Sequence, residues 1–208
     1  MKELLDTLNN LKNSGINLSI RERIGEFRKI KEKSLTEIFN ELCFCILTAN
    51  CSAEKCIEVQ DRIGNGFSDL NEQDLSLQLK KFGYRFPNIR AKYIAKARES
   101  QEELIRRIRS DTDLFKLREW LVKDIKGLGY KEASHFLRNI GFTDIAILDF
   151  HIIDLLTKFN LIEKPKALSK TKYLEIEKLL RQIAEKLNLN LAELDLYMWF
   201  TETGKVLK

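Results

Sequence analysis

Apolar residues recur at helical spacing along most of this 208-residue chain, and no segment alternates apolar with polar residues as a half-buried strand does. Leu, Glu, Lys and Ala are abundant, and only two prolines interrupt the chain. We therefore predict an all-α fold. We expect two helical lobes with a cleft between them, with the middle of the chain (approximately residues 35–125) forming one lobe. Residues 1–34 and 126–208 would then form the other.

Apolar periodicity and helix-start signals predict where the individual helices begin and end. Ser34 and Glu37 have the spacing of a capping box, and Asn71, Asp111 and Asn190 are candidate caps. The expected helices are residues 2–13, 19–32, 35–50, 53–63, 72–82, 88–108, 113–124, 130–140, 150–158, 171–187 and 191–202.

Composition excludes some classes of protein. With 44% apolar and 32% charged residues, neither disorder nor a membrane protein is favoured, and the first residues do not form a secretion signal. We therefore expect an intracellular protein. The net charge of +5 is concentrated in two basic stretches, residues 21–33 and 80–98. This modest excess suits a polyanionic partner, but solvated helix faces would carry the same residues.

The four cysteines, Cys43, Cys45, Cys51 and Cys56, fall within fourteen residues. Their spacing is not that of paired C-x2-C zinc ligands, and the first two lie in an apolar run. We expect buried, unreactive thiols, with a structural iron–sulfur cluster as the alternative. No metal or other cofactor is expected.

The turn Lys126-Gly127-Leu128-Gly129 separates two apolar helical faces. Glycines allow positive φ, so the turn can direct successive N–H groups outward at the positive end of the second helix. Such a turn can bind a phosphate, which would make this a helix-hairpin-helix that grips DNA through its backbone. Gly-x-Gly alone favours an ordinary helical corner over a DNA-binding hairpin.

Two further residues favour a catalytic interpretation. Lys131 lies in the first turn of the second helix, roughly opposite the apolar Ala133, where a deprotonated amine could attack carbon. Asp149 follows the apolar run 145–148 and is a plausible helix N-cap that could also stabilise positive charge developing on a sugar. A solvated lysine and a simple cap remain the alternatives.

Residues 121–153 resemble the hairpin, loop and aspartate of the endonuclease III superfamily of DNA glycosylases, with Lys131 and Asp149 at its catalytic positions. The segments 45–50, 83–86, 131–139 and 195–200, together with the ending 204–208, resemble the short 8-oxoguanine DNA glycosylase/AP lyases of archaea and some bacteria. The resemblance covers nearly the whole chain. It implies that Lys131 attacks C1′ of the sugar to form a Schiff base, that Asp149 stabilises the charged transition state, and that β-elimination then cleaves the strand.

The resemblance also implies roles in binding double-stranded DNA. Asn50 would fill the space left by the flipped nucleotide, Phe86 beside Arg85 would act as a wedge, and His151 would lie near the same DNA. Taken alone, Asn50 could be a helix C-cap, Phe86 a core aromatic and His151 a structural residue. Trp199 would stack on the flipped purine, although aromatics at helical spacing are more often core.

The resemblance also implies that Lys208 helps to distinguish 8-oxoguanine from guanine. N7 is an acceptor in guanine and an N–H donor in the lesion. An acceptor such as a terminal carboxylate would therefore bind the lesion in preference to guanine. Two departures narrow the assignment. The C-terminal four-cysteine loop of endonuclease III is missing, and Phe150 stands where a basic side chain is expected, which leaves one phosphate contact in doubt.

The expected function is therefore excision of 8-oxoguanine followed by strand cleavage, by a monomer in the prokaryotic cytoplasm that is associated with the nucleoid while it acts. Two alternatives stay open. One is a glycosylase for another oxidised base, and the other is a helix-hairpin-helix protein that binds DNA without catalysis.

Overall fold

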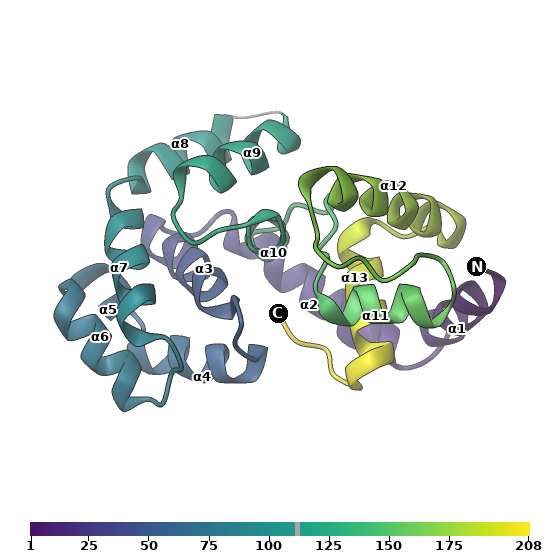
Figure 1. The fold of residues 1–208 in the computed structure, drawn as a ribbon, viewed down its shortest axis with the longest axis horizontal. Coiled ribbons are helices and arrows are strands. Elements are labelled where there is room, and N and C mark those ends of the chain that lie inside the picture. The colour runs from purple at the N-terminus through teal and green to yellow at the C-terminus, as the bar shows by residue number, and fades with distance from the viewer. Residues whose placement is uncertain (111–112) are drawn as a thin grey trace. The chain divides into compact units, whose positions relative to one another are not determined.

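The computed structural model describes residues 1–110 and 113–208, and these residues form helices and connecting loops without a strand, which confirms the all-α prediction (Figure 1). The helices are α1 (Lys2–Lys12), α2 (Ile16–Ile30), α3 (Leu35–Thr48), α4 (Ala53–Ile63), α5 (Gly66–Asp69), α6 (Glu72–Lys81), α7 (Pro87–Arg98), α8 (Gln101–Ser110), α9 (Leu114–Asp124), α10 (Tyr130–Asn139), α11 (Phe150–Lys158), α12 (Lys170–Leu187) and α13 (Leu191–Thr203).

The chain divides into two compact units, which we call the hairpin unit (Lys29–Ile140) and the terminal unit (Met1–Arg28 with Gly141–Lys208). The core of the hairpin unit is built around α3, whose residues from Ile38 to Thr48 are buried with one exception, the half-buried Asn40. Helices α4, α5, α7, α8 and α10 all pack on α3. A helix that is apolar on most of its surface must be surrounded in this way to leave water.

In the terminal unit, α13 has the corresponding central position. Its buried residues include Leu194, Tyr197 and Met198, and it packs against α1, α11 and α12. Segments from the two ends of the chain therefore share one core, because α1 and α13 are neighbours.

The division of the chain differs from the expected one at both boundaries. We expected residues 126–208 to belong with the N-terminal segment, but the hairpin unit extends to Ile140. The reason is that α10 packs on both α3 and α9, through buried side chains such as Phe136 and Leu137. The boundary consequently falls at Gly141, after this helix has ended.

Most helix positions agree with the sequence prediction, and two do not. The expected helix 88–108 is two helices, α7 and α8, separated at residues 99 and 100, where short-range bonds from Glu99 to Lys96 and from Ser100 to Ala97 close the first helix. The single-turn helix α5 was expected to be a loop.

The predicted caps can be compared directly with the structure. Ser34 forms the predicted capping box, and Asn71 and Asn190 cap α6 and α13. Asp111 lies outside the described residues, and the cap of α9 is Asp113. Among the helices of the described residues, none is both long and apolar enough to cross a membrane.

Candidate active site

The turn between α9 and α10 has one glycine that its geometry requires and one that it does not. Gly127 has φ of +94°, and a Cβ there would lie 2.5 Å from Cδ2 of Tyr93. Gly129 is extended and is the N-cap of α10. Only Gly127 therefore needs the conformational freedom of glycine, whereas we expected it of both residues.

The N–H groups of this turn are partly used within the protein. Gly129 donates to Oε2 of Glu132 at 3.1 Å, and Leu128, whose side chain is buried, donates to the carbonyl of Ile125 at 3.3 Å. This corrects the expectation that successive N–H groups point freely outward. Lys126 is exposed beside the turn. A DNA phosphate at the start of α10 would have to share the Gly129 N–H with the Glu132 carboxylate or displace it.

Lys131, the second residue of α10, contacts Thr48 at the end of α3. Its Nζ lies 3.5 Å from Oγ1 of Thr48 and 3.9 Å from Oε1 of Glu132, and its side chain is 22% exposed. Thr48 in turn donates its hydroxyl hydrogen to the carbonyl of Cys45 at 2.8 Å. The amine thus has a hydroxyl and a carboxylate as neighbours, and the side chain that carries it is partly exposed.

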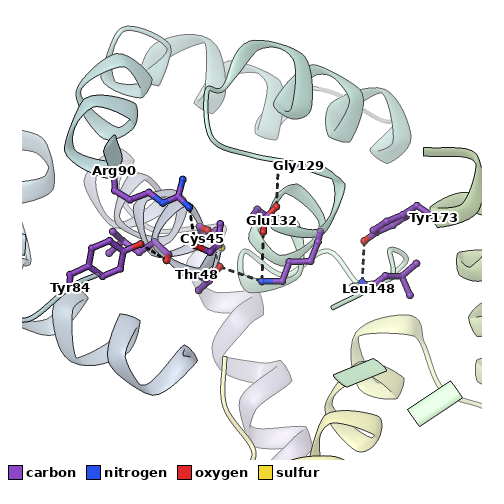
Figure 2. A network of polar contacts seen from close by, with 11 residues as sticks. Cys45, Thr48, Tyr84, Arg90, Gly129, Glu132, Leu148 and Tyr173 are labelled. Carbon is purple, nitrogen blue, oxygen red and sulfur yellow. Dashed lines mark hydrogen bonds and ion pairs between the residues drawn. The ribbon is translucent and has the colours of Figure 1, made fainter. Parts of the chain in front are cut away.

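The carbonyl groups at the end of α3 accept hydrogen bonds from the loop before α7 and from α7 itself (Figure 2). The Tyr84 hydroxyl donates to Leu47 at 2.6 Å, and Arg90 Nη2 donates to Ala49 at 2.8 Å. Burial raises the pKa of the Tyr84 phenol, so this group remains a protonated donor. The two bonds satisfy carbonyls that a helix end leaves without partners, and they fix this loop and the first turns of α7 against α3.

Three predicted DNA-binding residues lie at this junction of α3 and α7. Asn50 is exposed and has a left-handed backbone with φ of +63°. It lies just beyond the end of α3, whereas we expected this helix to include residue 50. Phe86 caps α7 and is half-exposed, with the guanidinium carbon of Arg85 4.9 Å from its ring centroid. Phe86 is therefore partly accessible and not fully buried in the core, and Asn50 occupies the left-handed position typical of a helix end.

The cysteines lie around the same end of α3. Cys43, Cys45 and Cys56 are buried, and Cys51 is half-buried. Burial raises the pKa of the Cys43 and Cys56 thiols, which keeps them protonated and unreactive. Within residues 1–110 and 113–208, no three His, Cys, Asp or Glu side chains are grouped as metal ligands, so the geometry offers no support for a cluster.

In the terminal unit, Asp149 is the N-cap of α11, as predicted. Its Oδ1 accepts the N–H of Ile152 at 3.0 Å. The preceding segment is fixed by the Tyr173 hydroxyl, which donates to Ala146 at 2.8 Å. The same hydroxyl accepts from the N–H of Leu148 at 3.2 Å (Figure 2). One carboxylate oxygen of Asp149 is therefore committed to the helix, and the half-exposed side chain retains acceptor capacity for a ligand.

A row of rings follows Asp149. Phe150 is 68% exposed, and its ring centroid lies 3.9 Å from that of His151, which meets Trp199 edge-on at 4.5 Å. Nε1 of Trp199 is buried and has no hydrogen-bond partner among the described residues. His151 therefore packs between two aromatic rings, and Trp199 is half-buried. Lys208 is half-buried.

The structure thus assigns the predicted residues to two groups. Lys126, Gly127, Leu128, Gly129, Lys131, Asn50, Arg85 and Phe86 belong to the hairpin unit, and Asp149, His151, Trp199 and Lys208 belong to the terminal unit. Sequence reasoning missed Thr48 and Glu132. Thr48 is 83 residues from its partner Lys131, and no local pattern connects them. Glu132 could have been found, because Gly129 and Glu132 have capping-box spacing.

Comparison with known proteins gives a consistent result. The family model described as 8-oxoguanine DNA glycosylase matches residues 20–189. A Methanocaldococcus jannaschii protein named 8-oxoguanine DNA glycosylase/AP lyase is 50% identical over 210 residues, with 99% of both chains covered. A Korarchaeum cryptofilum protein with the same name is 48% identical, with 99% of this chain and 98% of the other covered.

Solved structures extend the similarity to the fold. The M. jannaschii 8-oxoguanine glycosylase/lyase in complex with a 15mer DNA containing 8-oxoguanine has a TM-score of 0.95 at 50% identity, covering 99% of this chain and 100% of that one. The Thermotoga maritima 8-oxoguanine DNA glycosylase has a TM-score of 0.93 at 41% identity, covering 100% of this chain and 99% of the other.

Proposed function

The chain belongs to the 8-oxoguanine DNA glycosylase family, and from this premise we propose that it excises 8-oxoguanine from double-stranded DNA and then cleaves the strand as an AP lyase. The observation that carries the proposal is the Lys131 amine, held by Thr48 and Glu132 in the first turn of the helix that follows the hairpin. A protein that only bound DNA would need the turn but not a restrained amine beside it.

Lys131 is the proposed nucleophile. Its neutral amine forms a bond to C1′ of the damaged nucleotide while the bond from C1′ to N9 breaks, and the base leaves with the electron pair and takes up a proton. Loss of the amine proton and opening of the sugar ring give a Schiff base between Nζ and C1′. Removal of a proton from C2′ then expels the 3′ phosphate by β-elimination, so that excision and strand cleavage share one covalent intermediate.

Asp149 is the proposed electrostatic partner of this reaction. As base departure proceeds, positive charge develops on the sugar ring, and a carboxylate stabilises that charge more strongly than it stabilises the neutral substrate. The capping bond to Ile152 holds the carboxylate in one orientation before DNA arrives, which limits the reorganisation that the reaction requires.

The proposed DNA grip combines the hairpin with the junction of α3 and α7. Lys126 and the backbone of Gly127 to Gly129 would bind phosphates of one strand, with His151 as a further contact. Phe86 would enter the base stack as a wedge, Arg85 beside it would contact the DNA, and Asn50 would occupy the space of the flipped nucleotide. Exposure of Asn50, Arg85 and part of Phe86 supports these roles, since each side chain can reach a ligand.

Trp199 and Lys208 are the proposed groups for recognition of the flipped base. The half-exposed Trp199 ring offers a face for stacking, a contact that contributes about 1–3 kcal/mol per base in other proteins. Lys208 would contact the edge that distinguishes 8-oxoguanine from guanine. We further propose that the protein acts as a monomer on DNA in the prokaryotic cytoplasm.

The test is cleavage of a labelled duplex carrying one 8-oxoguanine opposite cytosine, with and without borohydride. The intact protein should cut the strand and form a trapped adduct, and a variant lacking Lys208 should excise the lesion more slowly. A duplex with an oxidised pyrimidine serves as the control for lesion choice. If the duplex with the oxidised pyrimidine is cleaved as fast or faster, 8-oxoguanine is not the preferred substrate. If the protein binds the 8-oxoguanine duplex but neither cleaves nor traps it, the protein is a DNA-binding protein without this catalytic activity.

A further inference from the structure

Thr48 is a buried polar residue whose hydroxyl has a defined direction. It is the last residue of α3, its side chain is 6% exposed, and the hydroxyl donates to the Cys45 carbonyl at 2.8 Å. A hydroxyl has a single hydrogen. With that hydrogen directed at Cys45, the oxygen can only accept a hydrogen bond from any other neighbour.

That other neighbour is Lys131, with Nζ 3.5 Å from the Thr48 oxygen. A neutral amine has two N–H donors and one lone pair, and only the lone pair can attack carbon. An acceptor that takes one N–H turns the lone pair away from itself. A freely rotating hydroxyl could instead donate to the lone pair and occupy it, but the bond to Cys45 prevents this.

We propose that Thr48 is a positioning residue for Lys131: its acceptor-only hydroxyl binds one N–H of the amine and leaves the nucleophilic lone pair open to the sugar. The inference rests on the proposed function, because it assigns Thr48 a task only if Lys131 attacks DNA. It adds a residue that local sequence patterns do not indicate.

The surroundings of Thr48 are rigid enough for this task. The carbonyls on either side, those of Leu47 and Ala49, accept bonds from Tyr84 and Arg90 (Figure 2). The end of α3 is consequently fixed by groups other than Lys131. Glu132, the other neighbour of the amine, is fixed by its bond to the Gly129 N–H, so that the hydroxyl and the carboxylate together restrict where Nζ can lie.

A purely structural role for Thr48 predicts different behaviour. Threonine hydroxyls often bond to the carbonyl three or four residues earlier in a helix, and Thr157 does so with Ile153 at 2.8 Å in α11. If Thr48 only completed its helix, its replacement by valine would affect stability in the same way as the Thr157 replacement and would not affect the chemistry. Thr157→Val is therefore a matched control.

The experiment measures Schiff-base formation by borohydride trapping in a single turnover, on duplexes with 8-oxoguanine or a preformed abasic site, together with DNA affinity and thermal melting. Thr48→Val should slow trapping by about 10- to 100-fold on both duplexes, because misplacement of a reacting group has effects of this order. DNA affinity should change less than about 3-fold, since the bound state still forms. Thr48→Ser, which keeps the hydroxyl, should restore most of the rate, and Thr157→Val should leave it unchanged.

Trapping by Thr48→Val at the rate of the intact protein would overturn the inference, as would a Thr48→Ser rate as low as that of Thr48→Val. If Thr48→Val does not fold, Thr48→Ala takes its place and is compared with Thr48→Ser in the same way. Failure of the proposed function gives a different pattern: the intact protein forms no adduct, or Lys131→Gln forms one as readily as the intact protein.

Discussion

Lys131 and Asp149 are held in place by different kinds of interaction. The partners of Lys131 include Thr48, which is 83 residues away, and the arrangement depends on α3, α7 and α10 being packed together. Asp149 is oriented by the N–H of Ile152, three residues along the same chain. The position of Lys131 therefore depends on tertiary packing, whereas that of Asp149 depends mainly on local capping. The two residues should respond differently to substitutions around them.

The largest expected effect comes from removing the amine itself. Lys131→Gln should lower strand cleavage by at least about a thousandfold and abolish the trapped adduct, because glutamine has no nucleophilic nitrogen. DNA binding should survive, since the phosphate contacts are proposed to come from the turn and not from Nζ. Gel-shift affinity and trapping in the same samples check this. An unchanged adduct yield would show that another amine is the nucleophile.

Asp149→Asn tests whether Asp149 contributes its charge to catalysis in addition to its local role as a helix cap. Asparagine caps helices as well as aspartate does, so the melting temperature should stay close to that of the intact protein. The loss of negative charge should slow excision on the order of 10²-fold. Asp149→Ala should slow excision similarly and also lose about 1 kcal/mol of stability with the cap. An Asp149→Asn protein as active as the intact one would restrict Asp149 to capping.

The two glycines of the turn offer a third test, on stability. Gly127→Ala places a Cβ at positive φ and against Tyr93, so it should lower the free energy of unfolding by about 3 kcal/mol. Gly129→Ala should cost much less, because its backbone is extended and the nearest group is the end of the flexible Glu132 side chain. Urea unfolding of both variants makes the comparison. Equal losses would contradict the turn geometry.

Substitution of two tyrosines should give the smallest effects. These substitutions compare the hydrogen bonds that fix the segment before Asp149 with those that fix the end of α3 beside Lys131. Tyr173→Phe removes two hydrogen bonds in the segment before Asp149, and Tyr84→Phe removes one at the end of α3. We expect losses of about 1.5 and about 1 kcal/mol respectively, measured by thermal melting. Tyr84→Phe should also slow trapping slightly through Thr48, and a trapping defect confined to Tyr173→Phe would weigh against this link.

The same contrast explains what the sequence could and could not predict. Asp149 as an N-cap, the capping box at Ser34 and the helix periods are local features, and each was predicted from neighbouring residues. The break between α7 and α8 was missed because neither glycine nor proline marks it and the apolar spacing from Ala97 to Leu104 continues across it.

The site was predicted less completely than the fold. The two glycines were expected to allow positive φ in the turn, but Gly129 is an extended cap whose N–H is satisfied by Glu132. Thr48 could not be connected to Lys131 because their contact requires α10 to pack on α3, and single-sequence patterns contain no information about that pairing. The extent of the hairpin unit was unexpected for the same reason.

The most direct test of the account is to identify the residue that forms the covalent bond. The adduct with an 8-oxoguanine duplex is reduced with borohydride, the protein and DNA are digested, and tandem mass spectrometry locates the lysine that carries the sugar remnant. We expect the remnant on Lys131. A remnant on Lys126, on the N-terminal amine or on any other lysine would contradict it.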